Sequence, residues 1–175
     1  MNARNLILFL LVFAPLVLGP GVHPALSASG STTFQYLVGT GFLCGLGTGA
    51  CPDIARADNG DTLEITGSGT LSIHPKSVGG GGTFTQKDSG GNVLASGTWT
   101  AQRLISFVPY LVLPNNLAGG KALIRVHLST GSDAILDIDC AIGAPPGQTE
   151  GVTLNIQDVI NFNKKVSGIN IYIKQ

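Results

Sequence analysis

Short segments that alternate between apolar and polar residues, separated by glycine and proline, most constrain the fold of this chain. Alternation with a period of two places successive side chains on opposite faces of a strand, and glycine and proline mark turns. A helical period is not sustained for three turns anywhere, and only Gln157 to Phe162 is consistent with one helical turn. The predicted strands are Thr33–Leu37, Thr62–Thr66, Thr70–His74, Thr83–Lys87, Val93–Ala101, Leu104–Val108, Ala122–Leu128, Ala134–Cys140, Val152–Ile156 and Ile169–Ile173. The pattern predicts an all-β fold, a single-domain antiparallel β-sandwich or small β-barrel of about 8–10 strands.

The segment GGGGTFTQKDSGGNVLASGTW, residues 79–99, predicts a central hairpin. If Asp88–Gly91 is a four-residue loop, Phe84 faces Ala95, and Phe84 and Trp99 share one side of the ribbon. A register one residue longer would mix the apolar and polar sides, so the segregation of side chains supports this pairing. We therefore expect Trp99 to be buried.

The glycine run at the start of this segment invites comparison with a phosphate-binding loop. Such a loop ends in Gly-Lys-Ser/Thr and leads into a helix, whereas this run leads into a strand of Thr and Phe, and Lys87 comes only after it. We interpret the run as a flexible approach to the hairpin. Replacement of Gly79 or Gly80 is then expected to have a mild effect.

Residues 1–28 have the pattern of a secretory signal peptide, with a positive start, an apolar run from Leu6 to Leu18 and small residues around Ser27 and Ala28. The apolar run is shorter than the ~20 residues that span a bilayer. We expect residues 29–175 to be a single domain without a membrane span. The predicted location is secreted or extracellular, or periplasmic if the source is a Gram-negative bacterium.

The charged residues are few and balanced, with 10 Lys and Arg, 10 Asp and Glu, and no basic stripe. Nucleic-acid binding requires clustered Lys and Arg, so we do not expect it. The cysteines are Cys44, Cys51 and Cys140. Cys44 and Cys51 flank a pliable loop and are the favoured disulfide pair in an exported protein, although Cys140 could also pair with either. Cys140 lies on the more apolar face of its strand and is expected to be a free core residue.

Several acidic and histidine residues could carry chemistry, and for each we favour a structural interpretation. Asp137 and Asp139 share a strand face, which we interpret as outward and solvated. His127 could meet Ser129 and one of these aspartates in space. A loop calcium ion held by the aspartates at positions 53, 58 and 61 is a further alternative, but the ligand spacing of an EF-hand is absent. We assign no catalytic, cofactor-binding or metal-binding residues and expect no cofactor.

An apolar stretch with two prolines, LISFVPYLVLPNN at residues 104–116, is unusual for a connecting segment. Its candidate residues are Val108, Tyr110, Leu111, Val112 and Leu113. Such residues either form a lid over the end of a sandwich or barrel or make a contact surface. We favour the lid and expect a monomer.

The sequence leaves three function classes open. The favoured one is a secreted, non-enzymatic protein that acts at a surface or on an extracellular partner of unknown identity. The alternatives are a small β-barrel that binds an apolar ligand and an extracellular enzyme whose site is assembled in space. Enzymatic activity is uncertain, and we favour its absence.

Overall fold

The computed structural model describes residues 31–175, and the signal peptide predicted for residues 1–28 lies outside them. The elements are β1 (Thr33–Val38), the 3-10 helix η1 (Gly41–Gly45), β2 (Asp53–Arg56), β3 (Thr62–Ser72), β4 (Ser77–Lys87), β5 (Val93–Val112), β6 (Leu117–Leu128), β7 (Asp133–Cys140), β8 (Gly151–Ile156), β9 (Ile160–Phe162), β10 (Lys164–Ser167) and β11 (Asn170–Lys174). The all-β prediction is confirmed. None of the helical segments in residues 31–175 has the length and apolar character needed to cross a membrane.

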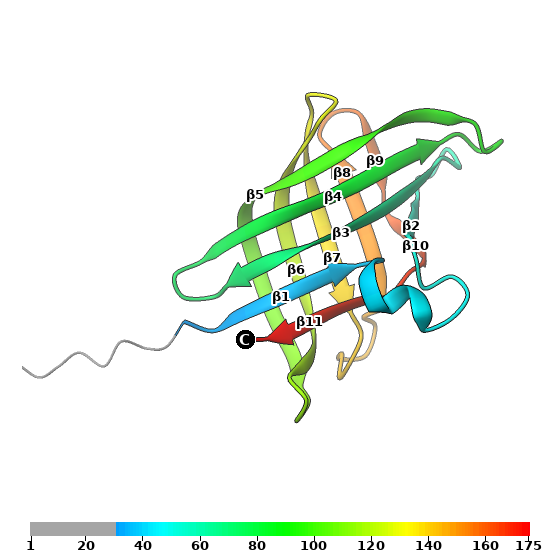
Figure 1. Cartoon of the computed structure of the whole chain (residues 1–175). Coiled ribbons are helices and arrows are strands. Elements are labelled where there is room, and N and C mark those ends of the chain that lie inside the picture. Colours follow the sequence, from blue (N-terminus) through cyan, green and yellow to red (C-terminus); the bar gives the residue numbers. More distant parts are fainter. Residues whose placement is uncertain (1–30) are drawn as a thin grey trace, which may run out of the picture.

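The strands β1, β3, β4, β5, β6 and β11 close into a hydrogen-bonded ring in which all neighbours are antiparallel. β2 and β10 extend the sheet from β3, and β7, β8 and β9 extend it from β6. Figure 1 shows the result as two layers, with β1, β3 and β4 in front and β6, β7 and β8 behind. The fold is therefore a barrel-like sandwich, consistent with the predicted class.

β5 is a single long strand that pairs first with β4 and then with β6. The predicted division into Val93–Ala101 and Leu104–Val108 is wrong, and so is the predicted connection Pro109–Gly120, because β5 continues to Val112. Its register with β6 shifts at several points, including directly after Pro109. Pro109 itself pairs with Gly120, but β4 pairs with β5 only as far as Thr100. One edge of β5 is therefore free of the other described strands at Pro109, and a residue without an N–H group can stay in the strand there.

Other boundaries also differ from the prediction. The predicted strands Thr62–Thr66 and Thr70–His74 are one strand, β3, which passes through two glycines and ends at Ser72. The predicted helical turn at Gln157 to Phe162 is wrong, because a turn there leads into β9. The short strands β2, β9 and β10 were not predicted.

The glycine run at residues 79–82 lies inside β4, so its interpretation as a flexible approach is wrong. A Cβ atom added at Gly82 would lie 1.8 Å from the carbonyl oxygen of Thr66 in β3. Gly80 has a φ of +119°, which L side chains rarely adopt, and a Cβ atom there would also meet β3. The run therefore allows the backbones of β3 and β4 to approach closely.

We expect Gly82→Ala to lower the free energy of unfolding by about 1–3 kcal/mol, the range for overpacking a filled site. Gly79→Ala is the matched control, since no atom lies within 4 Å of a Cβ at that position. It should change stability by less than about 0.5 kcal/mol. Urea denaturation followed by circular dichroism measures both variants. Equal stability of the two would contradict the close approach at Gly82.

The hairpin between β4 and β5 forms, but its register differs from the prediction. Phe84 pairs with Gly97 and not with Ala95. The Asp88 carboxylate accepts hydrogen bonds from the backbone and the side chain of Asn92, at 2.8 and 2.9 Å, and so extends the loop to that residue. A further register shift next to the loop moves the pairing by two residues in total. Because side chains alternate, a shift of two leaves Phe84 and Trp99 on their predicted face. Val93 was predicted on the same face, and this is wrong, because beside the register shift it pairs with Lys87 and is 60% exposed.

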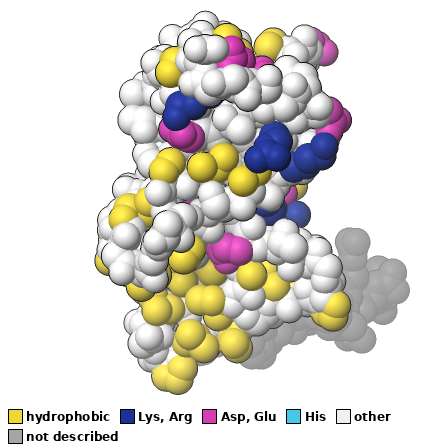
Figure 2. Space-filling view, turned by 90° about the vertical axis from the view of Figure 1, so that its right-hand side faces the viewer, with side chains coloured by type: hydrophobic (Ala, Val, Ile, Leu, Met, Phe, Trp, Pro, Cys, Tyr) yellow, Lys and Arg dark blue, Asp and Glu magenta, His cyan; other side chains and the backbone are white. Residues whose placement is uncertain are grey.

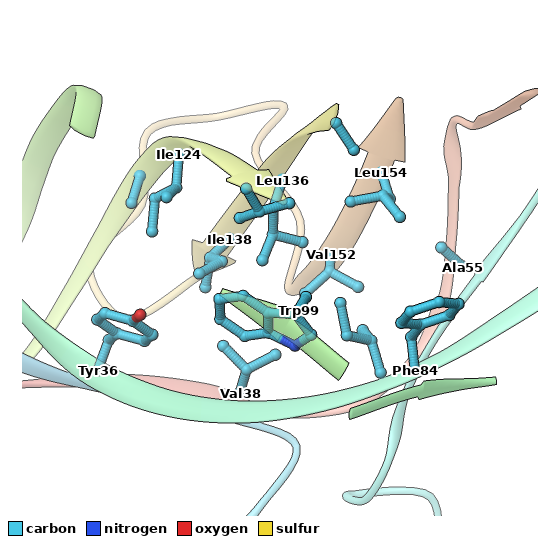
Figure 3. Close-up of a cluster of buried hydrophobic side chains, with 14 of the residues drawn as sticks. Tyr36, Val38, Ala55, Phe84, Trp99, Ile124, Leu136, Ile138, Val152 and Leu154 are labelled. Atoms are coloured by element: carbon cyan, nitrogen blue, oxygen red, sulfur yellow. The ribbon is translucent and has the colours of Figure 1, made fainter. Parts of the chain in front are cut away.

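The core lies between the two layers, where aromatic side chains meet aliphatic ones (Figure 3). Tyr36, Phe84 and Trp99 come from β1, β4 and β5. The labelled aliphatic side chains from β6, β7 and β8 are Ile124, Leu136, Ile138, Val152 and Leu154. All of these side chains are buried. Since side chains occupy the space between the layers, the arrangement argues against an interior site for an apolar ligand.

The cysteines pair as favoured, so that prediction is confirmed. Cys44 and Cys51 form a disulfide across the loop that contains the end of η1, with Cα atoms 5.1 Å apart. Cys140 is free and buried, as expected from its strand face. Burial raises the pKa of the Cys140 thiol to about 12, so this thiol is not prepared for nucleophilic chemistry.

Candidate functional site

The apolar segment singled out in the sequence forms the far end of β5. The exposed fractions of Val108, Leu111 and Val112 are 56%, 45% and 39%, whereas Tyr110 and Leu113 are partly buried. Figure 1 places this end of β5 and its connection to β6 at the bottom of the molecule. We call Val108, Leu111 and Val112 the apolar end.

The connection between β7 and β8, residues 141–150, lies against the apolar end. A Cβ atom added at Gly143 would be 2.4 Å from the Cβ atom of Leu111, which shows how closely the two segments approach. Figure 2 shows that hydrophobic side chains gather on the lower part of the molecule, the level at which Figure 1 places both connections. The end of β5 is therefore packed against a neighbouring loop and still presents aliphatic side chains to solvent.

Asp137 and Asp139 lie on the outer face of β7, but the prediction that both are solvated is wrong, because Asp139 is 0% exposed and the Asp137 side chain is 15% exposed. Lys165 of β10 reaches over the strand to the Asp139 carboxylate at 3.0 Å, and the Tyr110 hydroxyl donates to it at 3.2 Å. Lys121 pairs with Asp137 at 3.1 Å. Side chains from β10 and from the end of β5 thus cover this part of the face.

This cluster does not provide the carboxylate pair of a glycosidase. Asp137 and Asp139 lie on the same strand, whereas a glycosidase needs two carboxyl groups on either side of the scissile bond. Burial raises the pKa of Asp137, and the hydrogen bond and positive charge of Lys121 act in the opposite direction. The ion pair with Lys121 therefore offsets part of the cost of burying Asp137, and the carboxylate has a structural role in it.

A second polar cluster lies deeper, and sequence reasoning missed it. Asp53 of β2 is 0% exposed and accepts a hydrogen bond from the Asn170 side chain at 3.4 Å. Glu150 accepts backbone hydrogen bonds from Asn170 and Ala141 at 2.6 and 2.7 Å. Burial, with the negative charge of Glu150, raises the pKa of Asp53 to about 8, and burial also raises the pKa of Glu150. The only signal in the sequence was that Asp53 shares a strand face with the apolar Ala55.

The remaining candidate residues do not come together as a site. Asp58 pairs with Lys164 at 2.9 Å and Asp61 accepts from Gln86 at 3.2 Å, so neither joins Asp53 around a calcium ion. Residues 31–175 contain no group of three His, Cys, Asp or Glu side chains that could hold a metal ion.

His127 pairs with Asp133 at 2.8 Å and not with the aspartates considered in the sequence. The Ser129 hydroxyl accepts the backbone N–H of Thr98 at 3.0 Å. These contacts give no support to a serine–histidine–aspartate arrangement built on these residues. Comparison with known proteins found no matching family model, no matching curated protein and no matching solved structure.

Proposed function

We propose that this chain is an exported, non-enzymatic binding protein that contacts an extracellular macromolecule with its apolar end. The observation that carries the proposal is the exposure of Val108, Leu111 and Val112 on one ordered strand. Burying an aliphatic side chain is worth about 1.5–3 kcal/mol, so covering these residues would stabilise a complex. Export is proposed from the pattern of residues 1–28, and the disulfide between Cys44 and Cys51 is compatible with an oxidising compartment.

The other two function classes receive less support. An apolar-ligand barrel needs interior space, and Tyr36, Phe84 and Trp99 extend into the interior of this fold. An enzyme needs converging reactive groups, and the Asp137 and Asp139 carboxylates are each held by a lysine. A binding function requires only the exposed surface that is present.

Leu111→Ser tests the proposal, with Leu94→Ser at the opposite end of β5 as the matched control. Leu94 is 55% exposed and Leu111 is 45% exposed. In the organism that encodes the protein, the wild type and Leu94→Ser should elute from a sizing column in a complex larger than the free chain. Leu111→Ser should elute as the free chain, with a melting temperature within about 2 °C of the wild type, because little core packing is lost.

Two results would contradict this proposal. A fall of many degrees in the melting temperature of Leu111→Ser would mean that the residue serves the fold, as a lid does. Elution of the wild type as the free chain would leave the apolar end without a partner. Sedimentation of the purified protein adds a check on the expected monomer, because a dimer broken by Leu111→Ser would identify the partner as a second copy.

A further inference from the structure

The outer face of β6, β7 and β8 carries two hollows. The first has a volume of about 500 Å³ and is mostly polar. Its lining residues are Lys121, Asp137, Gly147, Gln148, Thr149, Thr153, Asn163 and Lys165. The second has a volume of about 310 Å³. Its lining residues are Arg103, Arg125, Asp133, Ala134, Ile135, Asn155 and Gln157. Both volumes fall within the ~300–1,000 Å³ of common ligand pockets.

The two hollows lie along the same strands. The first hollow is lined by Asp137 of β7 and Thr153 of β8. The second hollow is lined by Asp133 of β7 and Asn155 of β8. At ~3.3 Å per residue, Asp133 and Asp137 are about 13 Å apart along the strand. A ligand that occupied both hollows would therefore be an extended chain that runs along β7 and β8.

Three cations on this face are paired with aspartates, whereas Arg103, which lines the second hollow, is in no ion pair within residues 31–175. The ion pairs are Lys121–Asp137 at 3.1 Å, Lys165–Asp139 at 3.0 Å and Arg125–Asp133 at 2.6 Å. Pairing fixes the donors and acceptors in place and leaves little net charge from these residues. A polyanion is bound by a cluster of unpaired cations, and Arg103 is a single one, so this surface suits a ligand that both donates and accepts hydrogen bonds without carrying charge.

The surface between the two hollows is aliphatic. Leu123 of β6 and Ile135 of β7 point outward and are partly buried, and Ile135 also lines the second hollow. A sugar ring has hydroxyl groups at its edge and C–H groups on its faces. Amide and hydroxyl side chains such as Asn155 and Thr153 can form hydrogen bonds with the sugar hydroxyl groups. Leu123 and Ile135 can pack against the C–H groups of the ring face.

We propose that the outer face of β6, β7 and β8 binds a neutral oligosaccharide or polysaccharide. This site contains none of the three residues of the apolar end and does not depend on the function proposed there, although the β7–β8 connection borders both. The ligand lies along β7 and β8, with its hydroxyl groups in the two hollows and a ring face over Leu123 and Ile135.

Affinity electrophoresis tests the proposal, using native gels that contain mannan, xylan, dextran or a soluble β-1,3-glucan. The wild-type mature chain should be retarded by at least one of these polymers. Titration calorimetry with an oligosaccharide of that polymer should show an at least tenfold weaker affinity for Thr153→Ala/Asn155→Ala. The matched control is Thr98→Ala/Thr100→Ala, on the exposed outer face of β5, which should keep the wild-type affinity.

Several outcomes would overturn the proposal. These are a lack of retardation in all four gels, an equal loss of affinity in the control variant, or binding only to anionic polymers that high salt abolishes. If Thr153→Ala/Asn155→Ala does not fold by circular dichroism, Gln148→Ala in the exposed β7–β8 connection replaces it, with the same expected loss. Leu111→Ser should bind the polymer like the wild type, so the failure of one proposal is distinguishable from the failure of the other.

Discussion

Replacing Trp99 with alanine is expected to lower the free energy of unfolding by roughly 3–5 kcal/mol, the range for removing a buried aromatic side chain. Trp99 is 1% exposed, and its indole N–H donates to the carbonyl oxygen of Thr66 at 2.9 Å. Its ring lies against Gly67, where a Cβ atom would be 2.2 Å from the ring. Urea denaturation followed by circular dichroism measures the loss.

Trp99→Phe is the control for this prediction. Phenylalanine keeps most of the buried apolar surface, so the loss in free energy of unfolding should be smaller than for Trp99→Ala. Some loss is still expected, because the Thr66 carbonyl is left without its donor. Because the chain has 1 tryptophan, fluorescence of the native protein reports on this side chain alone. Emission typical of a water-exposed indole would show that Trp99 is not in the core, as would a loss below about 0.5 kcal/mol for Trp99→Ala.

Raising the pH from about 5 to about 8 is expected to lower the melting temperature, and Asp53→Asn should remove most of this dependence. The pKa of Asp53 is raised from 3.8 to about 8 in the folded protein. Between these values the folded chain keeps a proton that the unfolded chain has lost. The stabilisation is therefore largest at low pH and is lost as the pH rises toward the folded pKa.

The size of this effect follows from the proton difference. One proton bound only by the folded state changes the free energy of unfolding by at most about 1.4 kcal/mol per pH unit. For a domain of this size that is roughly 2–4 °C in melting temperature per kcal/mol. Asparagine has the shape of the protonated acid, so Asp53→Asn should be more stable than the wild type at pH 8. Glu150, whose pKa is also raised, leaves a residual dependence of the same sign.

Asp88→Asn is the matched control for the pH experiment. Hydrogen bonds from Asn92 lower the pKa of the exposed Asp88, so its contribution changes only below the ordinary value of 3.8. Calorimetry at pH values from 5 to 8 should then give the wild-type slope for Asp88→Asn and a flatter one for Asp53→Asn. Equal slopes for all three proteins would contradict a protonated Asp53 in the fold.

The sequence was sufficient to predict the type of fold and the inward face of its central strands. Alternation is a local property, so it identifies β4, β5 and β7 and the burial of Phe84 and Trp99. It does not show where a strand continues through a glycine or proline, because that depends on the neighbouring strand. The glycine run lies within β4 because the backbone of β3 is too close for side chains there, and β5 continues through Pro109 because β4 pairs with it only as far as Thr100.

The polar clusters were less predictable than the core. Alternation along β7 places Asp139 on the outer face, where a solvated side chain is expected. It is buried because Lys165 and Tyr110, which belong to other strands, pack over its carboxylate. Asp53 lies in a short strand whose pattern is too brief to identify. Contacts of this kind depend on which distant segments become neighbours. Alternation within one segment does not show which other strand will lie beside it. The apolar stretch at the end of β5 was recognisable because its side chains are unusual for a connection.

The position of β11 has a consequence for biosynthesis. It is the last of the described strands along the chain, and it lies between β1, the first, and β6. The ring of strands cannot close while residues 170–174 are still in the ribosome, so β1 lacks its second neighbour until β11 has emerged. Pairing between such distant segments is slow compared with local contacts. Until then the ring is open between β1 and β6, and the backbone groups of these strands that β11 later pairs with remain available to other strands.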